Sequence, residues 1–167
     1  MSARDEIAVL PQLRPARPED LDGLCRLEIE SFEGDRFNRR QLTHLLTRAH
    51  AVTWVVENDS GILLGYGTLL LRRNSASARL YSFCVHPEAR GEGIGRRLAE
   101  RLEQEALERN RHKMILEVRA DNRRAIGLYR RLGFLPRRWL ENYYSDGCAA
   151  WQMDKVLEPN DSVEASF

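Results

Sequence analysis

A glycine-rich turn between an apolar strand and an amphipathic helix constrains this chain more than any other feature. The apolar segment 78–85 ends at a proline, which a central strand does not accommodate. Glycines follow at Gly91, Gly93 and Gly95, and apolar residues then recur on one side of segment 93–110. Amides at a helix N-terminus lack intrahelical partners, so this strand–turn–helix unit is expected to bind an anion.

The rest of the chain alternates between strand and helix patterns. The expected strands are 12–16, 52–57, 62–71, 78–85, 114–118, 134–140 and 149–156, and the expected helices are 18–32, 38–48, 93–110 and 122–132. This order predicts a mixed α/β (α+β) fold that starts antiparallel and contains one parallel, right-handed strand–helix–strand crossover. With 167 residues we expect one domain, residues 11–157, between a flexible N-terminus at 1–10 and a flexible tail at 158–167.

Composition limits the classes of function. The formal net charge of +1 argues against a surface built for nucleic acid. No apolar run of membrane-spanning length and no signal peptide is present, so we expect a cytoplasmic protein without a membrane partner. The three cysteines and four histidines show no ligand spacing, so no metal is expected. The 24 arginines against 2 lysines fit either phosphate recognition or a general codon preference.

The glycine-rich turn matches neither of two common phosphate loops. Arg96 replaces the third glycine of the dinucleotide fingerprint, and no Gly-Lys-Ser/Thr of a Walker A loop follows. Residues 90–95 instead read R-x-x-G-x-G, which resembles the coenzyme A pyrophosphate loop of GNAT acetyltransferases, although a plain tight turn is the alternative. The resemblance implies coenzyme contacts from Phe83, Cys84, Val85, Arg90, Gly91, Glu92, Gly93, Ile94, Gly95 and Arg96. His86, beside a proline, is interpreted as structural.

A second block, residues 116–134, resembles the L-E-V-R-x-x-N-x-x-A-x-x-L-Y-x-x-x-G-F pattern of RimI-type acetyltransferases. The resemblance implies a GNAT fold, with a mixed sheet of six to seven strands and about four helices, and acetyl-CoA as cosubstrate. It also implies Tyr129 as the acid that protonates the leaving thiolate, Glu117 as the general base, and Asn122 as a contact to the coenzyme arm. Asn122 is in addition expected to cap the following helix.

Both catalytic assignments have structural alternatives. Glu117 lies in an apolar strand, and a salt bridge to a neighbouring arginine such as Arg119 would also explain it. Tyr129 shares a helix face with Ala125 and Leu132 and would also fit a core position. A tyrosine pKa near 10 against about 8.5 for a thiol makes the proton transfer uphill by roughly 2 kcal/mol, a gap that local tuning would have to close.

The expected acceptor is the N-terminal α-amine of a protein or peptide. At pH 7 roughly one α-amine in seven is neutral, against fewer than about one lysine amine in a thousand, so a weak base suffices. By resemblance, the acceptor would lie between loops 31–38 and 142–148, which contain Phe32, Glu33, Tyr143 and Tyr144. Loop 31–38 lacks the Phe-Pro-Trp stretch of RimI. The alternatives are a lysine or small-molecule amine as acceptor, a silent coenzyme A-binding regulator, and an accessory domain that binds nucleic acid; the enzyme is expected to be a monomer or a homodimer.

Overall fold

The computed structural model describes residues 10–48 and 50–159. In chain order the elements are β1 (Gln12–Pro15), α1 (Leu21–Ser31), α2 (Arg39–Thr47), β2 (Ala51–Glu57), β3 (Leu63–Leu70), β4 (Ser77–Val85), α3 (Ile94–Glu108), β5 (Lys113–Arg119), α4 (Arg123–Arg131), β6 (Leu135–Leu140) and β7 (Ala150–Val156). The expected elements are all present. The first helix is shorter than expected, because Pro18–Asp20 form a 3-10 turn before α1. The flexible ends expected at 1–10 and 158–167 lie almost entirely outside the described residues.

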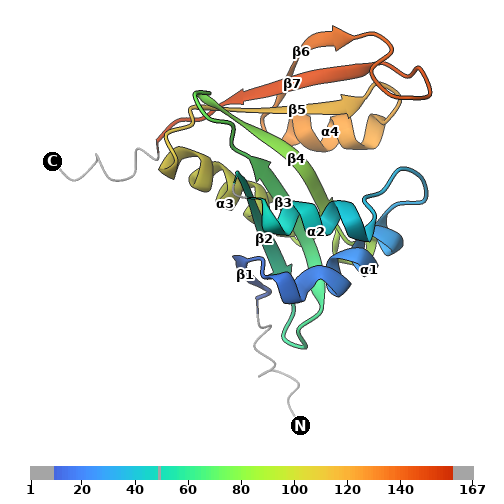
Figure 1. Ribbon diagram of the computed structural model, residues 1–167, viewed down its shortest axis with the longest axis vertical. Coiled ribbons are helices and arrows are strands. Elements are labelled where there is room, and N and C mark those ends of the chain that lie inside the picture. The colour runs from blue at the N-terminus through green and yellow to red at the C-terminus, as the bar shows by residue number, and fades with distance from the viewer. Residues whose placement is uncertain (1–9, 49, 160–167) are drawn as a thin grey trace, which may run out of the picture.

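The seven strands form one sheet in the order β1-β2-β3-β4-β5-β7-β6 (Figure 1). All neighbouring strands are antiparallel except β4 and β5, which are parallel and are connected through α3. The mixed sheet, its parallel crossover and the four helices confirm the fold class expected from the sequence.

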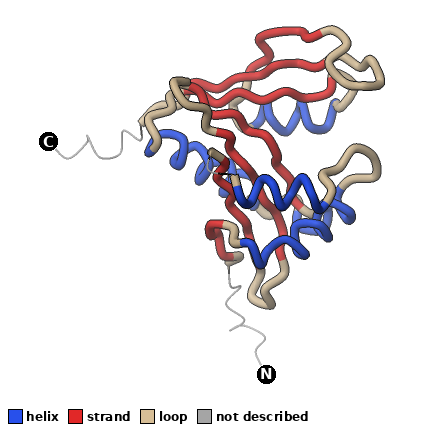
Figure 2. The backbone as a smooth tube through the Cα atoms, in the orientation of Figure 1, coloured by secondary structure: helices blue, strands red, loops and turns tan. Residues whose placement is uncertain are grey.

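Helices cover both faces of the first half of the sheet. α1 and α2 pack on one face of β2 to β4 and α3 packs on the other, as Figures 1 and 2 show. On α3, Leu98 and Leu102 are fully buried against the sheet. Full burial of such a side chain contributes about 1.5–3 kcal/mol. The opposite face is sealed by Leu24 and Leu27 of α1, which pack with Leu42 of α2.

Local sequence explains how the chain turns between these elements. Asn58 accepts hydrogen bonds from the amides of Ser60 and Ile62, and Gly61 has φ +79°, which closes the β2–β3 hairpin. The N-terminus of α2 is closed by a capping box in which Asn38 and Gln41 bond each other's backbone amides. The capping box therefore fixes the end of the polar loop before α2, and Arg36 ties the loop back to the carbonyls of Ile29 and Phe32.

The parallel strands β4 and β5 stay paired over only three residues. Their register ends at the pair Arg79 and Ile115, and beyond it the two strands diverge (Figure 2). On the other side of β4, the register to β3 shifts between Thr68 and Leu69, which leaves Tyr81 as the extra residue of a bulge. Divergence and bulge together open the sheet beside residues 81–85.

Candidate active site

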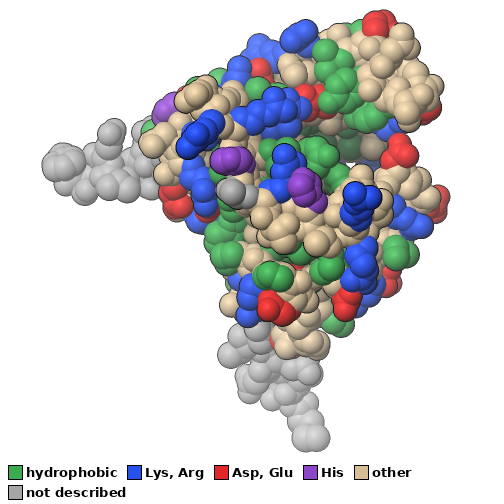
Figure 3. Space-filling model, viewed as in Figure 1, with side chains coloured by type: hydrophobic (Ala, Val, Ile, Leu, Met, Phe, Trp, Pro, Cys, Tyr) green, Lys and Arg blue, Asp and Glu red, His purple; other side chains and the backbone are tan. Residues whose placement is uncertain are grey.

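A groove of about 1180 Å³ lies where β4 and β5 diverge. Its walls come from α1 and the α1–α2 loop, β4, the glycine-rich turn, β5 and α4. Figure 3 shows the surface hollowed between the part that carries β5 to β7 and the part that carries α1 and α2. The groove is therefore formed by segments that are more than 100 residues apart in the chain, from Glu28 to Tyr144, and it joins the two blocks singled out in the sequence.

The glycine-rich turn presents free amides to one end of this groove. Gly91 has φ +86° and Gly93 has φ +79°, the left-handed region that favours glycine. A Cβ at either position would meet no atom within 4 Å, so the backbone is open to a ligand. Gly93 is also the N-cap of α3 and offers no side-chain acceptor to the first amides of that helix. The turn therefore offers several converging backbone donors to an anion.

Arginines surround the same end of the groove. Arg90 donates from Nε to the carbonyl of Val85 at 3.3 Å, and Arg96 donates from Nη2 to the carbonyl of Arg131 at 3.3 Å. Burial and the nearby charge of Arg124 lower the pKa of Arg90. The positive charges of Arg90 and Arg124 repel each other, so this end of the groove favours a bound anion. Sequence reasoning missed Arg124, although its place in the first turn of α4 brings it to the groove.

Most of the expected coenzyme residues line the groove. Those that do are Phe83, Cys84, Val85, Arg90, Gly91, Gly93, Gly95, Arg96 and Asn122. Ile94 does not, because its side chain is 2% exposed in the core. Glu92 does not either, because it points into solvent. The side chains of these two residues therefore face away from the groove, and any contact of theirs with a ligand would come from the backbone.

His86 has the structural role expected of it. Its Nδ1 accepts a hydrogen bond from the amide of Glu88 and caps the 3-10 turn Pro87–Ala89. Its Nε2 lies 2.9 Å from Oε2 of Glu30 on α1. The imidazole thus fixes the end of β4 to α1, and it is not among the residues lining the groove.

Tyr129 lines the groove from α4. Its ring packs edge-on between Phe83, at a centroid distance of 6.2 Å, and Phe134, at 6.0 Å. Burial raises the pKa of Tyr129, with smaller contributions from Cys84 and Tyr144. The phenol is therefore protonated at neutral pH, as a proton donor must be. Burial of the phenol therefore widens the gap between its pKa and that of a thiol.

Glu117 lies on β5, two residues beyond Ile115, at which the β4–β5 pairing ends. Its side chain lines the groove. Its Oε1 accepts hydrogen bonds from Nη1 of Arg79 on β4 and from Nε2 of Gln152 on β7, the latter at 3.3 Å. Glu117 therefore forms an ion pair, but its partner is Arg79 and not Arg119, the example suggested by the sequence. Arg119 lies on the same strand and is occupied by other carboxylates.

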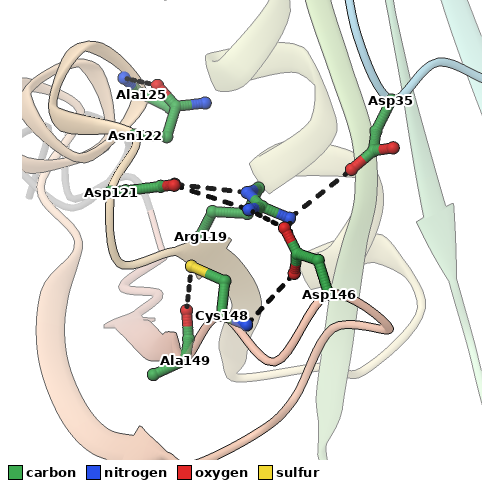
Figure 4. Close-up of polar contacts among 8 residues, drawn as sticks. All are labelled: Asp35, Arg119, Asp121, Asn122, Ala125, Asp146, Cys148 and Ala149. Carbon is green, nitrogen blue, oxygen red and sulfur yellow. Dashed lines mark hydrogen bonds and ion pairs between the residues drawn. The ribbon is translucent and has the colours of Figure 1, made fainter.

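Arg119 connects the two loops that border the acceptor end of the groove (Figure 4). Its Nη2 donates to Asp146 of the β6–β7 loop at 2.6 Å, its Nη1 reaches Asp35 of the α1–α2 loop at 3.5 Å, and its Nε donates to Asp121 at 3.2 Å. The guanidinium also lies 4.9 Å from the ring centre of Tyr144. The pKa of Asp146 is lowered by this arginine. One cation therefore fixes three aspartates around the mouth of the groove.

Asn122 caps α4 as expected, accepting from the amide of Ala125 at 3.1 Å (Figure 4). This bond uses Oδ1, so the side-chain NH₂ group is left to point elsewhere. Because Asn122 also lines the groove, that NH₂ group is a candidate donor to the coenzyme arm.

The acceptor end contains two of the four residues expected there. Phe32 and Tyr144 line the groove, whereas Glu33 and Tyr143 do not. Tyr143 is 47% exposed and packs edge-on against Tyr144. The sequence pointed to these loops but could not say which side chains turn inward. Tyr81 at the bulge was missed; it packs against Phe37 at 5.4 Å, and both line the groove.

A buried polar pair supports the α1 wall of the groove. Glu28 is 2% exposed and accepts a hydrogen bond from the hydroxyl of the fully buried Tyr66. Burial raises the pKa of Glu28, although Tyr66, the amide of Phe37 and the charge of Arg36 act in the opposite direction. Sequence reasoning missed Glu28, whose only signal is its place on the apolar face of α1.

Cys84 lies in the same wall, and burial raises the pKa of its thiol to about 12. The thiol is therefore protonated and weakly reactive at neutral pH.

Within residues 10–48 and 50–159 no group of three or more potential metal ligands comes together. In that same part of the chain, no helix has the length and apolar character needed to cross a bilayer.

Comparison with known proteins places the chain in one family. The model of the acetyltransferase (GNAT) family matches residues 21–134. A putative ribosomal protein bS18-alanine N-acetyltransferase of Bacillus subtilis is 31% identical over 134 residues, which cover 80% of this chain and 87% of that protein. An IAA acetyltransferase of Azospirillum brasilense is 31% identical over 154 residues, which cover 89% of this chain and all of that protein.

The fold is also that of solved structures. The ribosomal-protein-S18-alanine N-acetyltransferase of Escherichia coli superposes with a TM-score of 0.77 at 22% identity, over 92% of this chain and 97% of the other. At this identity the likeness concerns the fold alone.

Proposed function

The chain belongs to the acetyltransferase (GNAT) family, and on that premise we propose that it transfers the acetyl group of acetyl-CoA to the N-terminal α-amine of a protein or peptide. The observation that carries this proposal is the meeting of Glu117 and Tyr129 in one groove, at the point where β4 and β5 diverge. A carboxylate and a protonated phenol are the two groups that aminolysis of a thioester requires.

Acetyl-CoA, when bound, supplies the thioester carbonyl. The free amides at Gly91 and Gly93, with Arg90 and Arg124, are suited to hold its pyrophosphate at the N-terminus of α3. The arm between pyrophosphate and thioester would follow the gap beside residues 83–85, where β4 has lost its partner strand. Asn122 borders this gap from the other side.

Three proton transfers complete the reaction. Glu117 takes a proton from the acceptor ammonium, through a water molecule, and leaves a neutral amine that attacks the carbonyl carbon. As the carbon–sulfur bond breaks, the attacking nitrogen loses its second proton to water, and the hydroxyl of Tyr129 gives its proton to the leaving thiolate. Tyr129 then regains a proton from solvent and Glu117 releases one, so that each acetyl transfer releases one proton in total.

The chemistry of the acceptor follows from the weakness of this base. An α-amine needs little help, because a substantial fraction is already neutral near pH 7. The Bacillus subtilis relative is a putative ribosomal protein bS18-alanine N-acetyltransferase, and the side chain of alanine contains no nitrogen, which favours an α-amine as acceptor here as well. The aromatic pair Tyr81 and Phe37, with Phe32 nearby, offers an apolar wall for the first side chain of such a peptide.

A small-molecule or lysine amine is the second candidate acceptor. The match to the IAA acetyltransferase covers all of that protein and 89% of this chain. The name of that enzyme includes no protein substrate. The groove is also wide, about 1180 Å³, and would accommodate an acceptor without a peptide chain. A silent coenzyme A-binding regulator is disfavoured, because both Glu117 and Tyr129 face the groove.

An acceptor panel separates these candidates. Thiol release from acetyl-CoA should be followed with peptides that have a free N-terminus, the same peptides with a blocked N-terminus and a free lysine, polyamines, and aminoglycosides. We expect release with the free N-terminus and little with its blocked counterpart, with mass spectrometry locating the acetyl group. Faster release with the blocked lysine peptide or a polyamine would overturn the proposed acceptor. No release above hydrolysis would favour the regulator.

We further propose that the enzyme acts in the cytoplasm as a monomer or homodimer. The three cysteines, Cys25, Cys84 and Cys148, are all unpaired, which is compatible with a reducing compartment. Cell fractionation and light scattering coupled to size exclusion would test location and oligomeric state.

A further inference from the structure

We propose that Arg79 is a positioning residue for the general base, because it binds one oxygen of Glu117 and leaves the other free for the proton of the acceptor. The inference rests on the proposed function in that it takes Glu117 as the base. It adds a residue that lies outside both sequence blocks discussed above.

The location of Arg79 follows from the topology of the sheet. Arg79 and Ile115 are the last residues that pair between β4 and β5, and Glu117 is the next residue of β5 on the same face as Ile115. Past this pair no strand lies beside β5 on the β4 side. The guanidinium of Arg79 reaches across the start of the gap and forms an ion pair with the carboxylate of Glu117.

The two oxygens of Glu117 are in different environments. Oε1 accepts from Arg79 and from Gln152, which lies directly opposite Glu117 on β7. For Oε2 the described residues provide no hydrogen-bond donor, and Glu117 lines the groove. Two donors on one side of a carboxylate fix its plane, so the remaining oxygen keeps a constant direction. That oxygen is the one available to a water molecule or an ammonium group.

Among the described residues, Arg79 is the one cation that is hydrogen-bonded to Glu117. Arg119, the arginine of β5 itself, donates to Asp35, Asp121 and Asp146 instead. Tyr144 of the β6–β7 loop also lies near Glu117, and it is neutral because burial raises its pKa to about 12. Arg79 is therefore the charged group that holds Glu117 in place.

The ion pair between Arg79 and Glu117 is partly buried. The side chain of Glu117 is 10% exposed and that of Arg79 is 30% exposed, so the pair is only partly screened by solvent. Without Arg79, Glu117 would be a nearly buried carboxylate with a neutral amide as its donor. Such a group lacks the second donor that fixes the plane of the carboxylate, so its free oxygen would no longer keep a constant direction.

The test compares Arg79→Met with Arg79→Lys and with Arg138→Met, a matched change at an exposed arginine on the edge strand β6. For Arg79→Met we expect kcat with the best acceptor to fall about 10- to 100-fold, while KM for the acceptor stays within about twofold. Arg79→Lys should restore most of the rate. Binding of acetyl-CoA should stay within about twofold in all three variants, since Arg79 does not line the groove.

A double-mutant cycle keeps the proposal falsifiable if Arg79→Met proves unstable. Arg79→Gln combined with Glu117→Gln should be no slower than Glu117→Gln alone, because Arg79 acts through Glu117. A further loss of rate in the double variant relative to Glu117→Gln, or no recovery of rate in Arg79→Lys, would overturn the proposal. Failure of the proposed acceptor would instead appear in the wild-type panel, and the Arg79 series would then use whichever amine reacts.

Discussion

Arg119 on β5 reaches Asp35 on the α1–α2 loop, with Nη1 3.5 Å from Oδ2 (Figure 4). The same arginine binds Asp146 of the β6–β7 loop at 2.6 Å. Asp35 is 88% exposed, whereas the amide of Cys148 also bonds Asp146, so the two links differ in strength. Arg119 therefore stays with the β6–β7 loop and forms a breakable contact to the α1–α2 loop across the acceptor end.

Replacing Arg119 by Met should weaken acceptor binding and spare the coenzyme. An exposed ion pair contributes about 0.2–1 kcal/mol, so the expected rise in acceptor KM is at most about fivefold, with the dissociation constant of acetyl-CoA unchanged. Arg138→Met is the matched control. Steady-state kinetics at low and high salt would check this, since salt should raise the wild-type KM towards that of the variant. Equal KM values at low salt would show that the bridge does not order the loops.

Replacing Tyr129 by Phe should remove the proton donor and leave the aromatic packing with Phe83 and Phe134 in place. We expect kcat to fall about 100-fold or more with unchanged affinity for acetyl-CoA. Because burial raises the pKa of Tyr129, the wild-type profile should show no loss of rate from its ionisation below about pH 10. Single-turnover rates across this pH range would measure both effects, and an unchanged turnover in the variant would exclude Tyr129 as the acid.

Local patterns were enough to predict the elements and half of the site. Periodicity marked α3, the cap at Asn122 follows from its side chain, and the left-handed glycines Gly91 and Gly93 lie where the turn requires them. Each of these features depends on residues within a few positions of one another. The sequence alone was therefore sufficient for them.

The remaining features depend on contacts between distant segments. Arg79 meets Glu117 only because of the parallel register of β4 and β5, and Glu28 meets Tyr66 only because α1 packs on β3. No periodicity specifies which arginine faces Glu117, so the neighbour in sequence, Arg119, was a reasonable but wrong choice. The same limit applies to Glu33. The sequence identified its loop but not the direction in which its side chain points.

Replacing Gly93 by Val should weaken binding of acetyl-CoA through the backbone. Gly93 has φ +79°, which a residue with a Cβ adopts at a cost of about 1–2 kcal/mol, and more for a β-branched one. Because the added side chain meets no atom within 4 Å, the effect comes from backbone strain. We expect affinity to fall about 5- to 30-fold in calorimetry. Gly127→Ala, on α4 and also without close neighbours, is the control, and equal affinities in the two variants would contradict the role of the turn.

Replacing Glu28 by Gln should change how stability depends on pH. The amide oxygen of Gln can still accept from Tyr66, so the pair keeps its shape. In the wild type, burial raises the pKa of Glu28, so the folded state holds a proton that the unfolded state loses above about pH 4.3. The stabilisation linked to Glu28 is therefore complete below that pH and is lost as pH rises through the folded pKa, by about 1.4 kcal/mol for each unit of upward shift.

The measurement is the difference in unfolding free energy between Glu28→Gln and wild type, from urea titrations between pH 4.5 and 8. Groups such as Asp20, whose pKa Arg14 lowers, give the opposite slope, but they are present in both proteins and cancel in the difference. The difference should therefore shift in favour of the variant as pH rises. Tyr66→Phe keeps the carboxylate of Glu28 but removes a hydrogen bond that lowers its pKa. The unfolding free energy of this variant should therefore depend more steeply on pH than that of the wild type. Parallel curves for Glu28→Gln and wild type would mean that Glu28 is not protonated more readily in the folded state.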